Sequence, residues 1–146
     1  MISEDFSAYA IKVEVSLRIR MDPAALTSAV ERMMTAIALR CVANGTYLIG
    51  HIKSISEISD GSWLAGSITD LDGKVRSTGA FNSSSDKLGV VINALQYGLK
   101  MDKLETVVRE VVVEQLSFIG KVVVEEIGGE HDHKGGHDHF CKIDLE

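Results

Sequence analysis

An unbroken alternation of apolar and polar residues over positions 11–21 constrains the fold more than any other feature. Ile, Val, Val, Leu, Ile and Met occupy the odd positions, whereas Lys, Glu, Ser, Arg and Arg occupy the even ones. A period of two is that of a β-strand with one buried face and one solvated face. The chain is therefore expected to build a sheet on this strand.

A helix is predicted to follow this strand almost without a loop. Asp22 is a favourable N-cap, and Pro23 suits the first helical position. Asn44-Gly45 offers the C-terminal cap. Between these signals, apolar residues recur at helical spacing, namely Leu26, Val30, Met33, Ile37 and Cys41.

Hairpins are predicted for the middle of the chain. Strands over residues 47–58, 63–69 and 75–81 are separated by the turn signals Asp60-Gly61 and Asp72-Gly73. After a polar loop, residues 88–97 are apolar enough for a buried central strand, although a helix stays open for so short a run.

A second helix is predicted to begin at Asp102, which has capping-box spacing to Glu105. The many valines weaken this prediction, because β-branched side chains lose rotamer freedom in a helix. Gly120 offers an end to the helix and leaves residues 121–127 as a turn or a short strand. The expected apolar face consists of Leu104, Val107, Val108, Val111, Val112 and Ile119.

The element order β-α-β-β-β-β-α predicts an α+β two-layer sandwich. We expect a mainly antiparallel sheet of about five strands with two helices on one face. This globular domain should cover residues 1–127, and Gly128-Gly129 should begin a flexible tail over residues 128–146. The other face of the sheet, or the valine-rich helix, is left open as a homodimer contact.

Composition narrows the classes of protein to be considered. The chain has 146 residues, enough for one domain, and its 21 acidic and 15 basic residues give a net charge of −6. This charge argues against nucleic acid as a partner. The best basic patch, Lys12, Arg18 and Arg20, is interrupted by Glu14. No signal sequence or apolar membrane span is evident and only two cysteines occur, so a cytoplasmic location is expected, with no membrane partner.

The tail carries the strongest functional signal. Four of the five histidines fall within nine residues, as two His-Asp-His units around a Lys-Gly-Gly spacer. Alternate residues of an extended chain point to the same side about 6.6 Å apart, and glycine lets the chain turn back. Imidazoles could then converge on one ion, with a thiolate as a substitute ligand and the aspartates as ligands or as hydrogen-bond partners of the ligands. The predicted metal site comprises His131, His133, His137, His139, Cys141, Asp132 and Asp138.

These ligand types favour Zn or Ni, with Co or Cu as alternatives, over Mg or Ca. The leading hypothesis is a metal-binding accessory protein that delivers, stores or senses a transition-metal ion and hands it to a partner protein. A solvated tail without function competes with this hypothesis. The terminal Leu145-Glu146 resembles the junction that expression vectors leave before a tag.

Other hypotheses place function in the folded domain. An enzyme or small-molecule binder would need a pocket that converges on His51, Lys53 and Tyr97, with Asn93 as a further lining residue. His51 is otherwise a hydrogen-bonded strand residue beside Gly50, which marks a bulge or a close backbone approach. We interpret Asp70 and Asp72 as turn residues. Cys41 is interpreted as a small buried hydrophobe, and its pairing with Cys141 stays open. No nucleotide-binding glycine loop, nucleophile elbow or His-Glu-x-x-His helix occurs, which favours a binding protein over an enzyme without deciding the question.

Overall fold

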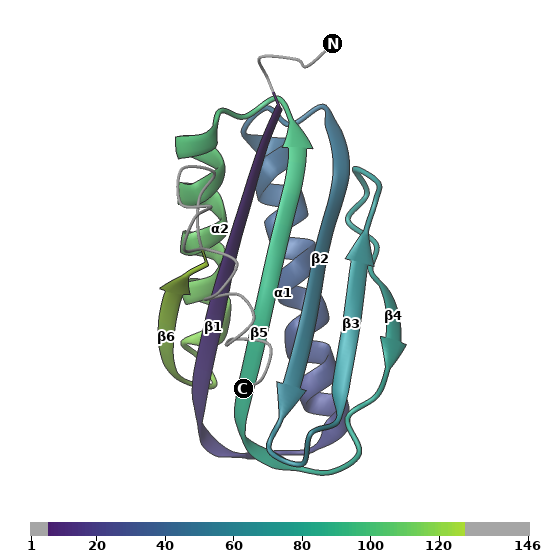
Figure 1. Ribbon diagram of the computed structural model, residues 1–146, viewed down its shortest axis with the longest axis vertical. Coiled ribbons are helices and arrows are strands. Elements are labelled where there is room, and N and C mark those ends of the chain that lie inside the picture. Colours follow the sequence, from purple (N-terminus) through teal and green to yellow (C-terminus); the bar gives the residue numbers. More distant parts are fainter. Residues whose placement is uncertain (1–5, 128–146) are drawn as a thin grey trace.

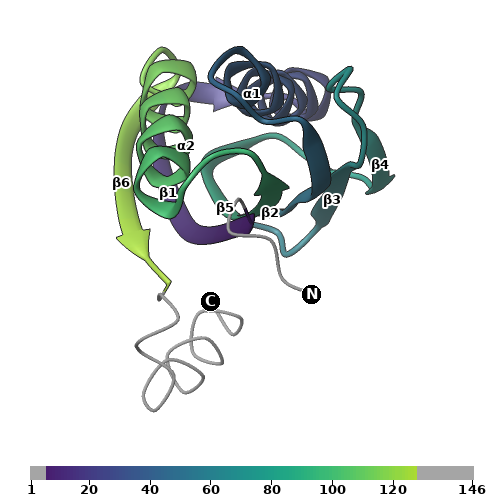
Figure 2. The same ribbon diagram turned by 90° about the horizontal axis from the view of Figure 1, so that it is seen from above.

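The computed structural model describes residues 6–127. This part of the chain forms one antiparallel sheet of six strands with two helices packed on one of its faces (Figures 1 and 2). The α+β sandwich predicted from the sequence is therefore confirmed. Its elements, in chain order, are β1 (Phe6–Met21), α1 (Pro23–Ala43), β2 (Leu48–Ile58), β3 (Trp63–Ile68), β4 (Arg76–Gly79), β5 (Ser85–Tyr97), α2 (Met101–Leu116) and β6 (Gly120–Glu126).

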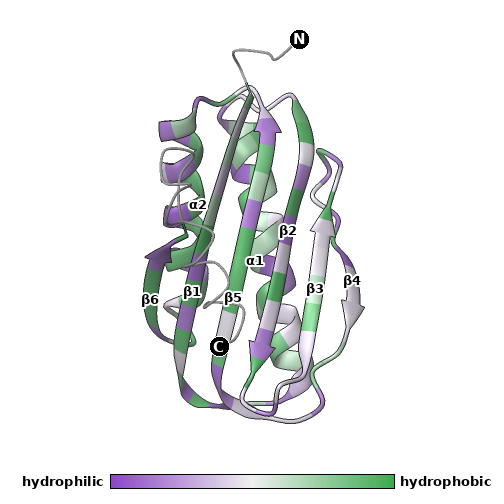
Figure 3. Ribbon diagram, in the orientation of Figure 1, coloured by the Kyte–Doolittle hydropathy of each residue, from purple (hydrophilic) through white to green (hydrophobic). Residues whose placement is uncertain are grey.

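The strand order across the sheet is β4-β3-β2-β5-β1-β6. The first strand lies between the two strands that come last in the chain, and every pair is antiparallel. The β1–β5 pairing runs from Phe6 opposite Tyr97 to Ser16 opposite Lys87. These long strands carry alternate hydrophilic and hydrophobic bands (Figure 3), because one side of the sheet meets the helices and no described element covers the other, here called the uncovered face.

The alternation in β1 sorts most of its side chains as predicted, but Ile19, expected on the buried face, is 74% exposed, and Lys12, expected in solvent, is buried. Ile11 and Val13 are fully buried under the helices, whereas Glu14 and Ser16 point to the uncovered face and are exposed. The strand begins at Phe6, five residues before the predicted start. The small residues Ser7, Ala8 and Ala10 give its first part no clear alternation of apolar and polar residues, although Tyr9 is buried on the helix side.

The predicted limits of α1 are confirmed. Asp22 accepts a hydrogen bond from the backbone N–H of Ala25 at 2.8 Å and so caps the helix, which Pro23 begins. Asn44 forms the C-cap. All five apolar residues of the predicted stripe are buried, and Met34 and Ala38 join them.

Helix α2 forms despite its valines. Its N-cap is Lys100, which makes no side-chain capping bond, so the predicted capping box of Asp102 and Glu105 is wrong. The helix ends at Leu116, four residues before Gly120. Four of its valines are buried, and their burial outweighs the weak helix propensity of each residue; they are Val107, Val108, Val111 and Val112.

The last described segment is a sixth strand, where a turn or short strand was predicted. Strand β6 pairs with β1, Gly120 opposite Leu17. A Cβ atom on Gly120 would lie 2.2 Å from the backbone oxygen of Ser16, so only glycine fits this close approach. The sheet therefore has six strands instead of about five. In contrast, β4 is shorter than predicted, four residues within the range 75–81.

One buried hydroxyl lacks a partner among the described residues. Ser56 is fully buried on the helix side of β2, and its Oγ makes no hydrogen bond there. A buried polar group without a partner costs about 1–3 kcal/mol. Ser7, in contrast, donates to the carbonyl of Leu99 at 2.7 Å and accepts from Gln96 at 2.7 Å.

Replacing these two buried serines with alanine should have opposite effects. Ser56→Ala removes an unsatisfied group, so we expect the free energy of unfolding to rise by about 1 kcal/mol. Ser7→Ala removes one hydrogen-bond partner from the Leu99 carbonyl and one from the Gln96 amide, which stay bonded to each other at 2.9 Å, and should lower it by about 1 kcal/mol. Urea denaturation of both variants measures these changes. Equal destabilisation by both would contradict the assignment of Ser56 as unsatisfied.

Candidate functional site

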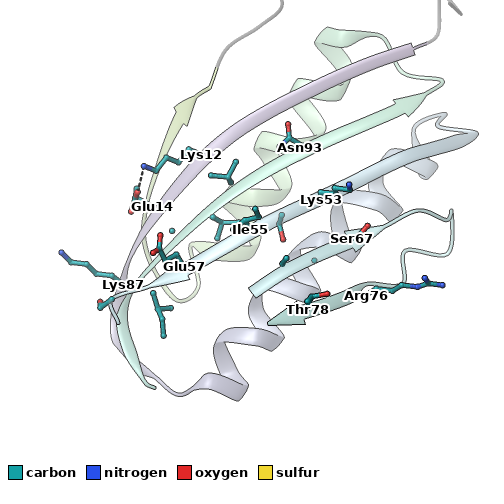
Figure 4. A pocket seen from close by; sticks show the side chains of 18 residues that line it. Lys12, Glu14, Lys53, Ile55, Glu57, Ser67, Arg76, Thr78, Lys87 and Asn93 are labelled. Atoms are coloured by element: carbon teal, nitrogen blue, oxygen red, sulfur yellow. Dashed lines mark ion pairs between the residues drawn. The ribbon is translucent and has the colours of Figure 1, made fainter. Parts of the chain in front are cut away.

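A groove of about 590 Å³ lies on the uncovered face of the sheet (Figure 4). This volume is within the usual range of ligand sites, about 300–1,000 Å³. The groove runs across five strands, from β1 through β5, β2 and β3 to β4. The antiparallel register determines which side chains meet in it.

The middle of the groove is a row of residues directly opposite one another on successive strands. Lys12 on β1 is opposite Val91 on β5, which is opposite Ile55 on β2. Ile55 is opposite Ala65 on β3, which is opposite Thr78 on β4. The three central members are apolar, and Ile55 is 59% exposed. The floor of the groove is thus apolar and open to solvent.

Two charged rows flank this apolar row. On one side Lys53 is opposite Ser67, which is opposite Arg76, and this row is basic. On the other side Gly89 lies between Glu14 and Glu57, and this row is acidic. Successive rows on the same face are about 6.6 Å apart. An occupant of the groove would therefore meet an apolar floor with a basic and an acidic border.

Cations outnumber anions in the groove. Four basic side chains and two acidic ones line it, a balance of +2 in a chain whose net charge is −6. Lys12 forms an ion pair with Glu14 at 3.2 Å. Three other cations have no ion-pair partner in the described part of the chain, and Figure 4 shows two of them, Lys87 and Arg76, at opposite sides of the groove. These three are Lys53, Arg76 and Lys87.

The pocket that the enzyme hypothesis required is present only in part. Lys53 and Asn93 line the groove, whereas His51 and Tyr97 do not. Tyr97 instead contacts Phe6 at a ring-centroid distance of 5.3 Å. His51 lies on β2 next to a register shift at Gly50, as the predicted bulge required. A Cβ atom on Gly50 would be 2.2 Å from the side chain of Leu95.

The surroundings of His51 favour the neutral form of its imidazole. It is half-buried, and this burial, together with the charge of Lys53, lowers its pKa below the ordinary value. We therefore expect NMR titration of the His51 ring protons to give a pKa below about 6.5. Lys53→Gln should raise that pKa, because it removes one of the two causes. A value at or above the ordinary one in the unmodified chain would contradict the burial of this ring.

Each of the three residues of the predicted basic patch on β1 makes a contact with a neighbouring part of the domain. Lys12 pairs with Glu14. Arg18 donates hydrogen bonds to the carbonyls of Ser117 and Phe118, at the end of α2, where a cation is favourable. Arg20 donates to the carbonyl of Ser84 at 3.1 Å. These arginines hold the connections of β1 to its neighbours.

A polar cluster fixes the end of β6. The Tyr9 hydroxyl donates to the Glu126 carboxylate at 2.8 Å, and Arg109 of α2 forms an ion pair with the same carboxylate. Burial is the main cause that raises the pKa of Tyr9; the hydrogen bond with Arg109 lowers it in part, and the Glu126 carboxylate raises it further. The cluster joins β1, α2 and β6, so the point from which the chain continues beyond β6 is held in place.

The seven predicted metal ligands lie outside the described residues. They are His131, Asp132, His133, His137, Asp138, His139 and Cys141. Within residues 6–127, no three His, Cys, Asp or Glu side chains are grouped so that they could hold a metal ion. The prediction that Asp70 and Asp72 are turn residues is confirmed. The Asp72 side chain accepts a hydrogen bond from the backbone N–H of Lys74, and the backbone carbonyl of Asp70 accepts one from the N–H of Gly73.

Cys41 is the buried small hydrophobe that the helix pattern indicated. It is fully buried and free, and burial raises the pKa of its thiol to about 11. Because the thiolate is the reactive form, such a thiol is protected. In a Cys141→Ser variant we expect no reaction of Cys41 with a thiol reagent at neutral pH until denaturant is added. Rapid labelling of the native variant would contradict this burial.

Comparison with protein-family models, with curated proteins and with solved structures finds no match to this chain. In the described part, neither helix is of the length and apolar character that a bilayer crossing needs.

Proposed function

We propose that this chain is a metal-binding accessory protein, in which the α+β domain carries a C-terminal segment that holds a Zn or Ni ion. The observation that carries the proposal is the pair of His-Asp-His units at residues 131–139. Imidazole nitrogens are common ligands of both metals, and a carboxylate next to a ligand histidine can orient it through a hydrogen bond.

The position of β6 supports this proposal. The segment begins just after Glu126, whose carboxylate is held by Tyr9 and Arg109. A metal-binding segment attached at a fixed point of a folded domain keeps its ion near any protein that docks on that domain. Delivery to a receiving protein is therefore the role that we favour over storage or sensing.

Calorimetric titration of the full chain with Zn and with Ni tests the proposal. The decisive variant replaces His131, His133, His137 and His139 with glutamine, and the matched control is His51→Gln, which changes the remaining histidine. The protein must be purified without an immobilised-metal column. We expect the fourfold variant to lose the binding and the control to retain it. Equal binding by the fourfold variant and the unmodified chain would refute the proposal.

A further inference from the structure

The groove on the uncovered sheet face has the properties of a site for an extended peptide that is both apolar and acidic. Its floor is formed by Val91, Ile55 and Ala65, and its charge balance is +2. Lys53 and Arg76 have no ion-pair partner among the described residues. A ligand that covers Ile55 and reaches these cations with carboxylates would bury apolar area and gain charge pairing at once.

We propose that the occupant of this groove is the C-terminal segment of the same chain, residues 128–146. This segment has five acidic residues and two lysines, a balance of −3, opposite in sign to the groove. It also carries a large aromatic residue, Phe140, and a β-branched one, Ile143, which are suited to contact with the apolar floor. Asp138 and Asp144 next to them match the basic border.

The register of β6 places the end of this strand beside the groove. Glu125 is directly opposite Lys12, the first member of the central row of the groove. The chain thus leaves the sheet two strands from the apolar floor. Crossing from β6 to β4 requires five strand spacings, about 24 Å. Nineteen residues can extend over about 60 Å, so Phe140 and Ile143 can reach Ile55.

Attachment to the same chain favours this occupant over a separate one. A short tether gives an effective concentration in the millimolar range, so contacts too weak for a separate peptide are sufficient here. The docking does not depend on metal binding, because the charge pairing and apolar contact exist without an ion. It places the proposed metal-binding residues over the sheet.

Paramagnetic broadening in the full, metal-free chain tests the docking. A nitroxide is attached to Cys141, while the buried Cys41 stays unmodified. We expect the amide signals of Ile55, Val91 and Ala65 to lose most of their intensity, and those of α1, on the opposite face, to keep theirs. Lys53→Glu combined with Arg76→Glu should restore the groove signals. The matched control, Lys103→Glu on the exposed side of α2, should not.

Two results would overturn the proposal. One is broadening no stronger in the groove than on α1. The other is broadening of the groove signals that is equally strong when spin-labelled chains without ¹⁵N are mixed with ¹⁵N-labelled chains that carry no label, because the occupant would then be the segment of a second copy. Either result leaves the metal titration unaffected, so failure of docking and failure of metal binding can be told apart.

Discussion

The Zn or Ni affinity of the full chain is expected to fall by about four orders of magnitude between about pH 7.5 and about pH 5.5. A histidine must be deprotonated to bind a metal, and an ordinary histidine takes up a proton near about pH 6.5. At about pH 5.5, each free imidazole must lose a proton to bind, which costs about a factor of ten. Four ligands together give about 10⁴, whereas two would give about 10².

The steepness of this pH dependence therefore measures how many histidines bind the ion. Calorimetry or competition with a chromogenic chelator at several pH values measures it. The His51→Gln variant is the control: it should leave the dependence unchanged, because this histidine lies on β2 and is not among the proposed ligands. A pH dependence that flattens in this variant would instead place His51 at the ion.

Ile92→Ala should lower the free energy of unfolding by about 2–5 kcal/mol, the usual cost of truncating a fully buried isoleucine. Ile92 lies on the helix side of β5 and is 0% exposed. The control is Ile55→Ala, the same substitution on the neighbouring strand but on the uncovered face, where the side chain is 59% exposed. In the absence of docking, that change should cost less than about 1 kcal/mol.

Denaturation in urea separates these two isoleucines. If the C-terminal segment covers the groove, Ile55→Ala also removes part of its contact and should cost more in the full chain than in the chain with Lys53→Glu and Arg76→Glu. Equal costs for Ile92→Ala and Ile55→Ala in both backgrounds would mean that the two faces of the sheet are buried alike, against the arrangement in Figure 2.

The parts of the fold that are encoded locally could be predicted from the sequence. The period of two in β1 and the capped stripe of α1 each lie within one segment, and Asp22 and Asn44 mark the helix ends by chemistry alone. The start of α2 could not be predicted in this way, because Lys100 is an N-cap without a side-chain bond. Strand β6 depends on pairing with β1, about a hundred residues earlier.

The groove could not be found from the sequence for a related reason. Lys53, Arg76 and Lys87 are far apart in the chain and lie in no motif. They come together through the register of four strands, and a shift of one residue in any pair would turn a strand's side chains to the other face. The sequence indicates Lys53 and Asn93 as pocket residues, but without the register nothing groups them with Ile55.

The place of β1 between β5 and β6 also determines when this protein can fold. A ribosome releases β1 first, yet both of its neighbours lie beyond residue 84, so its apolar side has no strand partner until most of the domain has been synthesised. Helix α2, which packs against β1, also comes late in the chain, at residues 101–116. Such distant pairing slows folding and prolongs the time during which apolar surface can cause aggregation. The chain should therefore need chaperones more during its synthesis than after it has folded.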